Sequence, residues 1–161
     1  MYQFSGKNYE NVFFTADEHY NSVRALRLSR RKMFTARKNL GFDEAAQTAA
    51  MNVGIIHQFN KIVGYNDLTF HIGDVGNHDN IIMLHGDHVL IVGNYEMKDF
   101  EIIHKKMGIS FDDWAENMKK KYGYVSILHN FTFTRDPETR EIAPFGIELH
   151  KDINKIFLTH E

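Results

Sequence analysis

Carboxylate, imidazole and amide side chains follow several apolar segments of this sequence, each at the point where the segment ends. Asp17 and His19 follow the first segment, Asp74 the second, Asn94, Tyr95 and Glu96 the third, and His160 the last. Oxygen and nitrogen donors of this kind bind divalent cations such as Mn²⁺, Fe, Ni²⁺ and Zn²⁺. The sequence contains no cysteine, so a metal would be held without thiolates. The pattern predicts a metal site.

The elements that must position these side chains are alternating strands and helices. Short β-branched and aromatic runs predict strands, and apolar residues three or four apart predict helices. The predicted strands are Asn11–Ala16, Leu68–Gly73, His88–Val92 and Lys155–Thr159. The predicted helices are Val23–Lys38, one capped by Asp43 and ended near Tyr65, Met97–Met107 and Phe111–Tyr122. Tyr124–Thr134 and Glu141–Leu149 flank a turn and predict an antiparallel hairpin.

This order of elements predicts an α/β layered sandwich in a single domain over residues 1–161. In such sheets the ends of parallel strands gather on one edge, where sites form. The formal net charge of −2 argues against a protein that binds polyanions over its whole surface. No apolar run reaches the length of a membrane span or a signal peptide, so we expect an intracellular protein without a membrane partner.

The motifs Asp-x-His at Asp17, Gly-Asp at Asp74 and Gly-Asn at Asn94, in this order, resemble those of the calcineurin-like metallophosphoesterases, particularly small bacterial and bacteriophage members. The resemblance implies a four-layer α/β/β/α sandwich and a hydrolase of the cytoplasm of a bacterial or phage-infected host cell. It implies two divalent metal ions (Mn, Fe, Ni or Zn) and a phosphomonoester or phosphodiester substrate, with a nucleotide or nucleic acid favoured. By the same resemblance Asp17 and His19 bind one metal, Asp74 bridges both, and Asn94 and His160 bind the second.

Two departures from the family pattern bear on catalysis. Tyr95 stands where the family has a histidine that serves the leaving oxygen, paired with the following acid, here Glu96. By the resemblance we expect Tyr95 and Glu96 beside the leaving group as catalytic residues, together with Asp74. A phenol donates hydrogen bonds but is a far weaker acid than an imidazolium. The family's later Gly-His-x-His segment does not appear, so we expect an incomplete domain and a weak catalyst. A phosphoesterase fold that only binds or scaffolds is the alternative function.

Substrate binding is predicted for residues outside the metal motifs. The stretch Arg24–Lys38 has seven basic residues and no acidic ones, and Arg30 and Arg31 at its centre could grip phosphate. A solvated helix face explains the stretch equally well, and a dedicated nucleic-acid-binding protein is a third hypothesis. His129 is a candidate at the substrate edge, with a structural role as its alternative. His71, inside a predicted strand, is expected to be a core or supporting residue.

Overall fold

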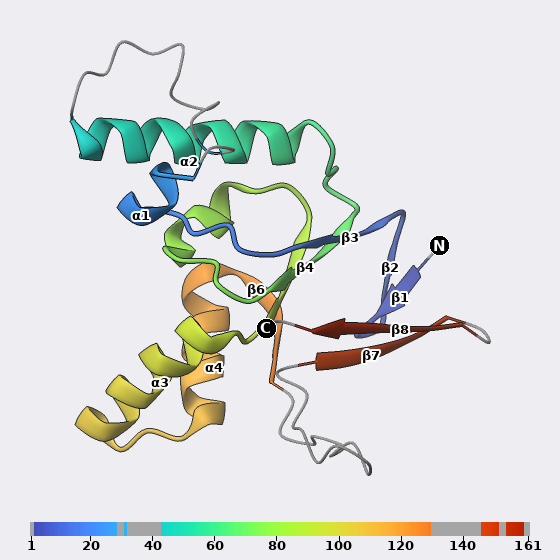
Figure 1. The fold of residues 1–161 in the computed structure, drawn as a ribbon. Helices are drawn as coiled ribbons and strands as arrows, with labels where there is room; N and C mark the ends of the chain where they lie inside the picture. Colours follow the sequence, from blue (N-terminus) through green and yellow to red (C-terminus); the bar gives the residue numbers. More distant parts are fainter. Residues whose placement is uncertain (1, 29–30, 32–42, 130–145, 152–153, 160–161) are drawn as a thin grey trace, which may run out of the picture.

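The computed structural model describes residues 2–28, 31, 43–129, 146–151 and 154–159, and its central sheet has four parallel strands (Figure 1). The strands lie in the order β3 (Val12–Thr15), β4 (Leu68–Ile72), β5 (Asp87–Ile91) and β6 (Tyr124–Leu128). Because all four run in the same direction, their carboxyl ends reach one edge of the sheet. The α/β class expected from the sequence is confirmed.

Helices connect the parallel strands. The segment between β3 and β4 contains α1 (Val23–Leu26) and α2 (Glu44–Asn60), and η2 (His78–Met83) precedes β5. The chain then passes through α3 (Asn94–Met107) and α4 (Phe111–Tyr122) before β6. None of the described helices is long and apolar enough to cross a membrane.

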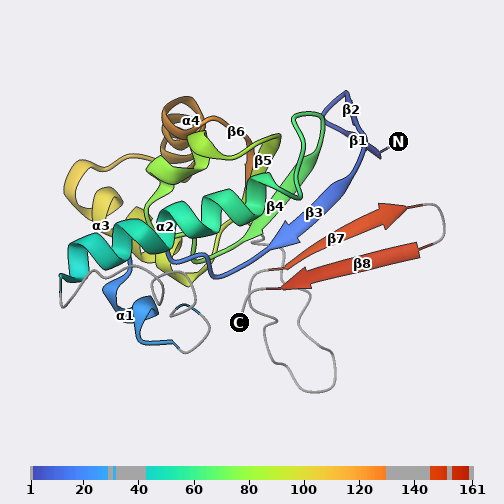
Figure 2. The ribbon, with the colours of Figure 1, turned by 90° about the horizontal axis from the view of Figure 1, so that it is seen from above.

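Two antiparallel pairs lie on the side of the sheet away from the helices (Figure 2). The first joins β1 (Tyr2–Phe4) to β2 (Lys7–Tyr9), and the second joins β7 (Gly146–Lys151) to β8 (Asn154–Thr159). Side chains alternate between the two faces of the sheet along each strand, so each face packs against different elements. Phe70 of β4 packs with Tyr9 of β2, whereas Leu90 of β5 packs with Trp114 of α4.

Two expected elements differ from the structure. The predicted helix from Val23 to Lys38 ends early, because α1 stops at Leu26, with Arg27 as its C-cap, and residues 32–38 lie outside the described residues. The predicted pairing of Tyr124–Thr134 with Glu141–Leu149 is wrong for the described part. There β6 is a parallel partner of β5, since α3 and α4 form the crossover, and β7 is an antiparallel partner of β8.

A buried chain of polar side chains holds the segment after β3 against the sheet. Glu18 Oε1 lies 2.7 Å from His71 Nδ1, and His71 Nε2 lies 3.0 Å from His88 Nδ1. Burial alone would raise the pKa of Glu18, but the charge and hydrogen bond of His71 hold it below its usual value. Burial, together with that charge, lowers the pKa of His88 to about 4. This chain of three buried side chains links the segment after β3 to β4 and β5.

His88 and His78, whose side chain is 10% exposed, should make the fold sensitive to mild acid. Burial also lowers the pKa of His78 to about 4, against about 6.5 for a histidine in an unfolded chain. Below pH 6.5 the unfolded chain therefore takes up protons that the folded protein does not bind. We expect the free energy of unfolding to fall by about 1.4 kcal/mol per pH unit for each histidine between pH 6.5 and 5. Urea titrations across this range measure the slope.

The variant His78→Gln, which keeps a hydrogen-bonding group for the Tyr124 hydroxyl, should reduce that slope by one histidine's share. The exposed His57, on α2, provides the control, because His57→Gln should leave the slope unchanged. A wild-type stability that stays constant from pH 6.5 to 5 would contradict the prediction.

Gly76 brings the segments after β3 and β4 into contact. Its φ is +83°, and a Cβ there would lie 2.6 Å from the carbonyl oxygen and 2.7 Å from the amide nitrogen of Tyr20. Gly108 has a similar φ of +69° but no atom within 4 Å of such a Cβ. We therefore expect Gly76→Ala to cost about 3 kcal/mol or more in unfolding free energy and Gly108→Ala about 1–2 kcal/mol. Equal losses in urea denaturation would show that the close approach at Gly76 does not matter.

Candidate metal centre

The segments that carry Asp17, His19 and Asp74 are joined by backbone hydrogen bonds beyond the end of β3 and β4. The amide of Asp17 donates to the carbonyl of Gly73 at 3.3 Å, and that of His19 donates to the carbonyl of Asp74 at 3.1 Å. Tyr20 and Val75 continue the pairing at 2.9 Å. The pairing places the first two predicted ligand segments side by side at the carboxyl edge of the sheet.

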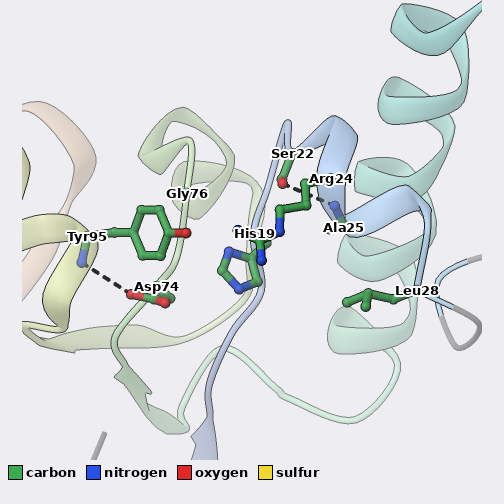
Figure 3. A pocket seen from close by; sticks show the side chains of 8 residues that line it. All are labelled: His19, Ser22, Arg24, Ala25, Leu28, Asp74, Gly76 and Tyr95. Carbon is green, nitrogen blue, oxygen red and sulfur yellow. Dashed lines mark hydrogen bonds between the residues drawn. The ribbon is translucent and has the colours of Figure 1, made fainter. Parts of the chain in front are cut away.

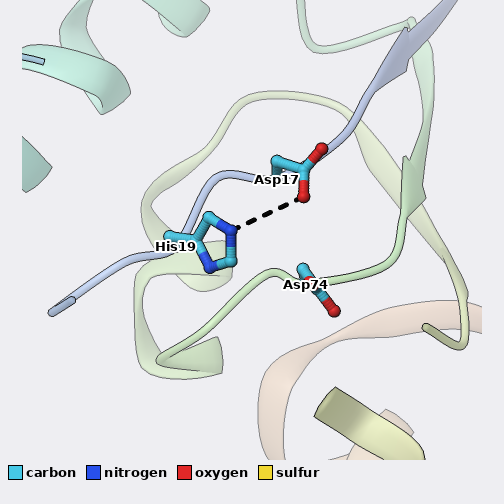
Figure 4. Close-up of side chains that lie close together, drawn as sticks. All are labelled: Asp17, His19 and Asp74. Atoms are coloured by element: carbon cyan, nitrogen blue, oxygen red, sulfur yellow. Dashed lines mark ion pairs between the residues drawn. The ribbon is translucent and has the colours of Figure 1, made fainter. Parts of the chain in front are cut away.

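Three of the predicted ligands converge there (Figure 4). Asp17, His19 and Asp74 each offer one oxygen or nitrogen atom, and these atoms all lie within 4.8 Å of one another. The Asp17 carboxylate lies 3.5 Å from His19 Nε2. Asp74 is 5% exposed, whereas the side chain of Asp17 is 59% exposed, so the cluster is open to solvent on the Asp17 side. Two carboxylates and one imidazole form a donor set that suits a borderline divalent cation.

The backbone at all three residues adopts a left-handed conformation that L-amino acids avoid. The φ angles are +57° at Asp17, +49° at His19 and +54° at Asp74. Each such residue costs about 1–2 kcal/mol relative to the right-handed conformation. Residues in such conformations cluster at functional sites, where the surrounding structure holds them in place.

Asn94 reaches the same edge from the third strand. It is the first residue of α3, after Gly93, and its side-chain Oδ1 is buried with no hydrogen-bond partner among the described residues. The next amide, of Tyr95, donates to Asp74 Oδ1 at 3.3 Å, so the start of α3 adjoins the cluster. A buried amide oxygen without a partner has the chemistry of a further cation ligand.

Glu96 has a different place from the one expected beside a leaving group. It is 2% exposed, and its carboxylate accepts three backbone hydrogen bonds. Oε2 accepts from the amides of Asp74 and Gly93 at 3.0 Å each, and Oε1 accepts from that of Val75 at 2.9 Å. This carboxylate ties the Asp74 segment to the start of α3 and thereby orients Asp74.

A cavity of about 380 Å³ opens beside the cluster (Figure 3). His19 and Asp74 line one part of it. The N-cap of α1 contributes Ser22, α1 itself contributes Arg24 and Ala25, and the segment after α1 contributes Leu28. Tyr95 forms another wall, with its ring 5.8 Å from the His19 ring in an edge-to-face arrangement at 84°. The sequence pattern placed Arg24 only within a basic stretch and did not indicate Leu28, because neither residue belongs to a ligand motif.

The remaining predicted residues divide into three groups. Arg31 lies next to the cluster, where its Nη2 donates to the backbone oxygen of Asp17 at 2.5 Å. His129 lies elsewhere, in a separate cavity of about 310 Å³ between α4 and β6, with its ring 3.7 Å from that of Phe111. Burial lowers the pKa of His129, which Asp112 partly opposes. Arg30 and His160 lie outside the described residues.

The Glu96 carboxylate should be essential for both stability and metal affinity. In Glu96→Gln an amide NH₂ must face backbone donors, and the charge that strengthens three hydrogen bonds is lost. We expect the free energy of unfolding to fall by about 2–3 kcal/mol. Because Asp74 loses its orientation, Mn²⁺ affinity should fall by about 10-fold or more in isothermal titration calorimetry. Glu101→Gln, at an exposed position of the same helix, is the control and should change neither quantity.

Comparisons with known proteins give no family for this chain. No family model matches the sequence, and no curated protein matches it. Among solved structures, the fold is similar to the crystal structure of a protein of unknown function from Aquifex aeolicus, with 16% identity and a TM-score of 0.48. The match covers 93% of this chain but 60% of that protein, so the chain spans less than two thirds of its length. The geometry of the site is therefore the basis for a functional proposal.

Proposed function

We propose that this chain is a metal-dependent phosphoesterase that hydrolyses phosphomonoesters or phosphodiesters at a centre for two divalent cations. The observation that carries the proposal is the convergence of Asp17, His19 and Asp74 within 4.8 Å, with all three in left-handed backbone conformations. This costly geometry at the carboxyl edge of a parallel sheet is typical of a functional site. The four-layer α/β/β/α arrangement of the metallophosphoesterases is part of the same proposal.

The donor set fits the cations that the family resemblance implies. Asp17, His19 and Asp74 would hold the first cation, and Asp74 with Asn94 would contribute to the second. The unpartnered, buried Oδ1 of Asn94 supports this assignment. His160 is assigned to the second cation by resemblance alone. A bound pair of Mn, Fe, Ni or Zn ions would supply Lewis-acid stabilisation of the phosphoryl oxygens and activation of water.

The other residues of the site bind and orient the substrate. Arg24 extends from α1 toward His19 in the cavity, where its guanidinium can pair with phosphoryl oxygens (Figure 3). Arg31 donates to the backbone oxygen of Asp17 and thereby supports that ligand segment. Glu96 is a positioning residue for Asp74. Tyr95 can donate a hydrogen bond from its hydroxyl. Because it is a tyrosine, this position offers no imidazole that could protonate a leaving group.

A second function, in which the chain binds metal and phosphate without efficient turnover, is favoured by Tyr95. Because a phenol is a weak proton donor, esters with poor leaving groups would react slowly. Bis(4-nitrophenyl) phosphate and 4-nitrophenyl phosphate avoid this requirement, since nitrophenolate leaves without a proton. Turnover of these two esters therefore separates a phosphoesterase from a binding module.

Asp74→Asn is the direct test of the proposed function. Asparagine tolerates the left-handed conformation, so the fold should persist while a bridging charge is lost. Substitution of residues that merely support metal ligands costs about 10- to 100-fold in affinity, and loss of a ligand charge should cost no less. We expect Mn²⁺ content, measured by elemental analysis after dialysis, and nitrophenyl ester hydrolysis to fall together.

Asp79→Asn changes an exposed carboxylate in η2 and is the matched control, with wild-type metal content and activity expected. Wild-type metal content in Asp74→Asn would refute the site assignment. Metal lost on Asp74→Asn, with a wild-type protein that binds metal but turns over neither ester, would favour the binding module.

A further inference from the structure

Two large apolar side chains remain exposed on walls of the cavity beside the metal ligands. Tyr95 is 45% exposed, and Leu28 is 54% exposed. Figure 3 shows Tyr95 at the left and Leu28 at the right of the cavity, with His19 between them and Asp74 below Tyr95. Exposed apolar surface that lines a cavity next to polar groups is characteristic of a small-molecule site.

The orientation of the Tyr95 ring is constrained by two contacts. One is the edge-to-face contact with His19, at 5.8 Å between ring centroids. The other is the ammonium of Lys98, 5.1 Å from the ring centroid. Lys98 is not among the residues that line the cavity. A ring held in this way presents a preorganised apolar surface, and less entropy is lost when a flat ligand packs against it.

With the proposed cations bound, the charges of the cavity would favour an anionic ligand portion next to the ring. Arg24 provides a guanidinium, and the cations expected at Asp17, His19 and Asp74 would add positive charge. The cavity volume of about 380 Å³ lies near the lower end of the range for small-molecule sites. Ser22 adds a hydroxyl group that can bond to the polar edge of a ring. The site therefore combines features for one phosphate and one planar ring.

We infer that the substrate is a small phosphate compound with a planar ring, of the nucleotide class, and that Tyr95 selects for it by stacking on that ring. The inference rests on the proposed function and specifies its substrate. Tyr95 then replaces a proton-donating imidazole with a surface that binds the organic part of the substrate. Ribose phosphates and other ring-free esters lack a face that could pack on Tyr95.

Binding measurements test this inference, because esters with poor leaving groups are expected to react slowly at this site. The probes are adenosine 5′-monophosphate, ribose 5-phosphate and adenosine, titrated calorimetrically into the full chain with Mn²⁺ and with the metal chelated. Stacking of a base on an aromatic side chain contributes to binding affinity. Tyr95→Ala should therefore weaken the binding of the monophosphate about tenfold or more. Tyr95→Phe, which keeps the ring, should stay within about twofold of the wild type. Ribose 5-phosphate should bind more weakly than the nucleotide and should not respond to Tyr95→Ala.

Tyr65→Ala is the control for removal of an exposed aromatic side chain, since Tyr65 is 75% exposed and packs in a tilted contact with His85 outside the cavity. The inference is overturned if the nucleotide does not bind, if it binds no better than ribose 5-phosphate, or if Tyr95→Ala weakens both equally. 4-Nitrophenyl phosphate, if it binds more tightly than the nucleotide and with the same dependence on Tyr95, overturns the nucleotide class in favour of an aryl ester.

The adenosine titration separates this inference from the proposed function. Adenosine carries no phosphate, so its binding should depend on Tyr95 and persist when the metal is chelated. If adenosine binding depends on Tyr95 but the nucleotide gains nothing from Mn²⁺, the ring site stands and the metal-dependent phosphoesterase fails. If Mn²⁺ strengthens both phosphates equally and Tyr95→Ala has no effect, the metal site stands and the ring site fails.

Discussion

The buried carboxylate of Glu96 is the interaction on which the arrangement of this site depends. Its two oxygens accept hydrogen bonds from the amides of Asp74, Val75 and Gly93, and so connect the ends of β4 and β5. A charged acceptor that is fully buried is stable only when its hydrogen bonds are complete, which fixes the donors as well. The precision of the Asp74 position therefore comes from a residue that does not line the cavity beside the cluster.

The same reasoning explains how three unfavourable backbone conformations persist side by side. Asp17, His19 and Asp74 would each relax to a right-handed conformation in an isolated peptide. Here the pairing of their amides and carbonyls across the two segments, and the packing of Tyr20 against Gly76, leave no such alternative. The energy that holds the ligands in place is supplied by the sheet and the buried histidines behind it, a division that is common at functional sites.

Much of this arrangement could be predicted from the sequence, because strand ends and ligand types follow simple rules. The strands β3, β4 and β5, the cap at Asp43 and the convergence of Asp17, His19 and Asp74 agree with the predictions. The full role of Glu96 could not be predicted, since two of its three partners are the backbone amides of Asp74 and Val75, 22 and 21 positions away, and backbone amides carry no residue signature. The strand that pairs with β6 was wrongly predicted for a related reason. Whether a strand pairs through a hairpin turn or through a helical crossover depends on long-range packing, and local strand propensity carries no information about that packing.

The position of β3 gives the two halves of the site different local stabilities. Among the described strands, β3 has one hydrogen-bonded neighbour, whereas β4 has two. Edge segments open at lower free energy than central ones, so the backbone of Asp17 and His19 should exchange its amide hydrogens faster than that of Asp74. A cation held by both segments would cross-link the edge strand to the centre of the sheet. By thermodynamic linkage, occupancy of the site and closure of this edge are then coupled. The concentration of the free cation therefore sets the fraction of molecules in which the edge strand is closed.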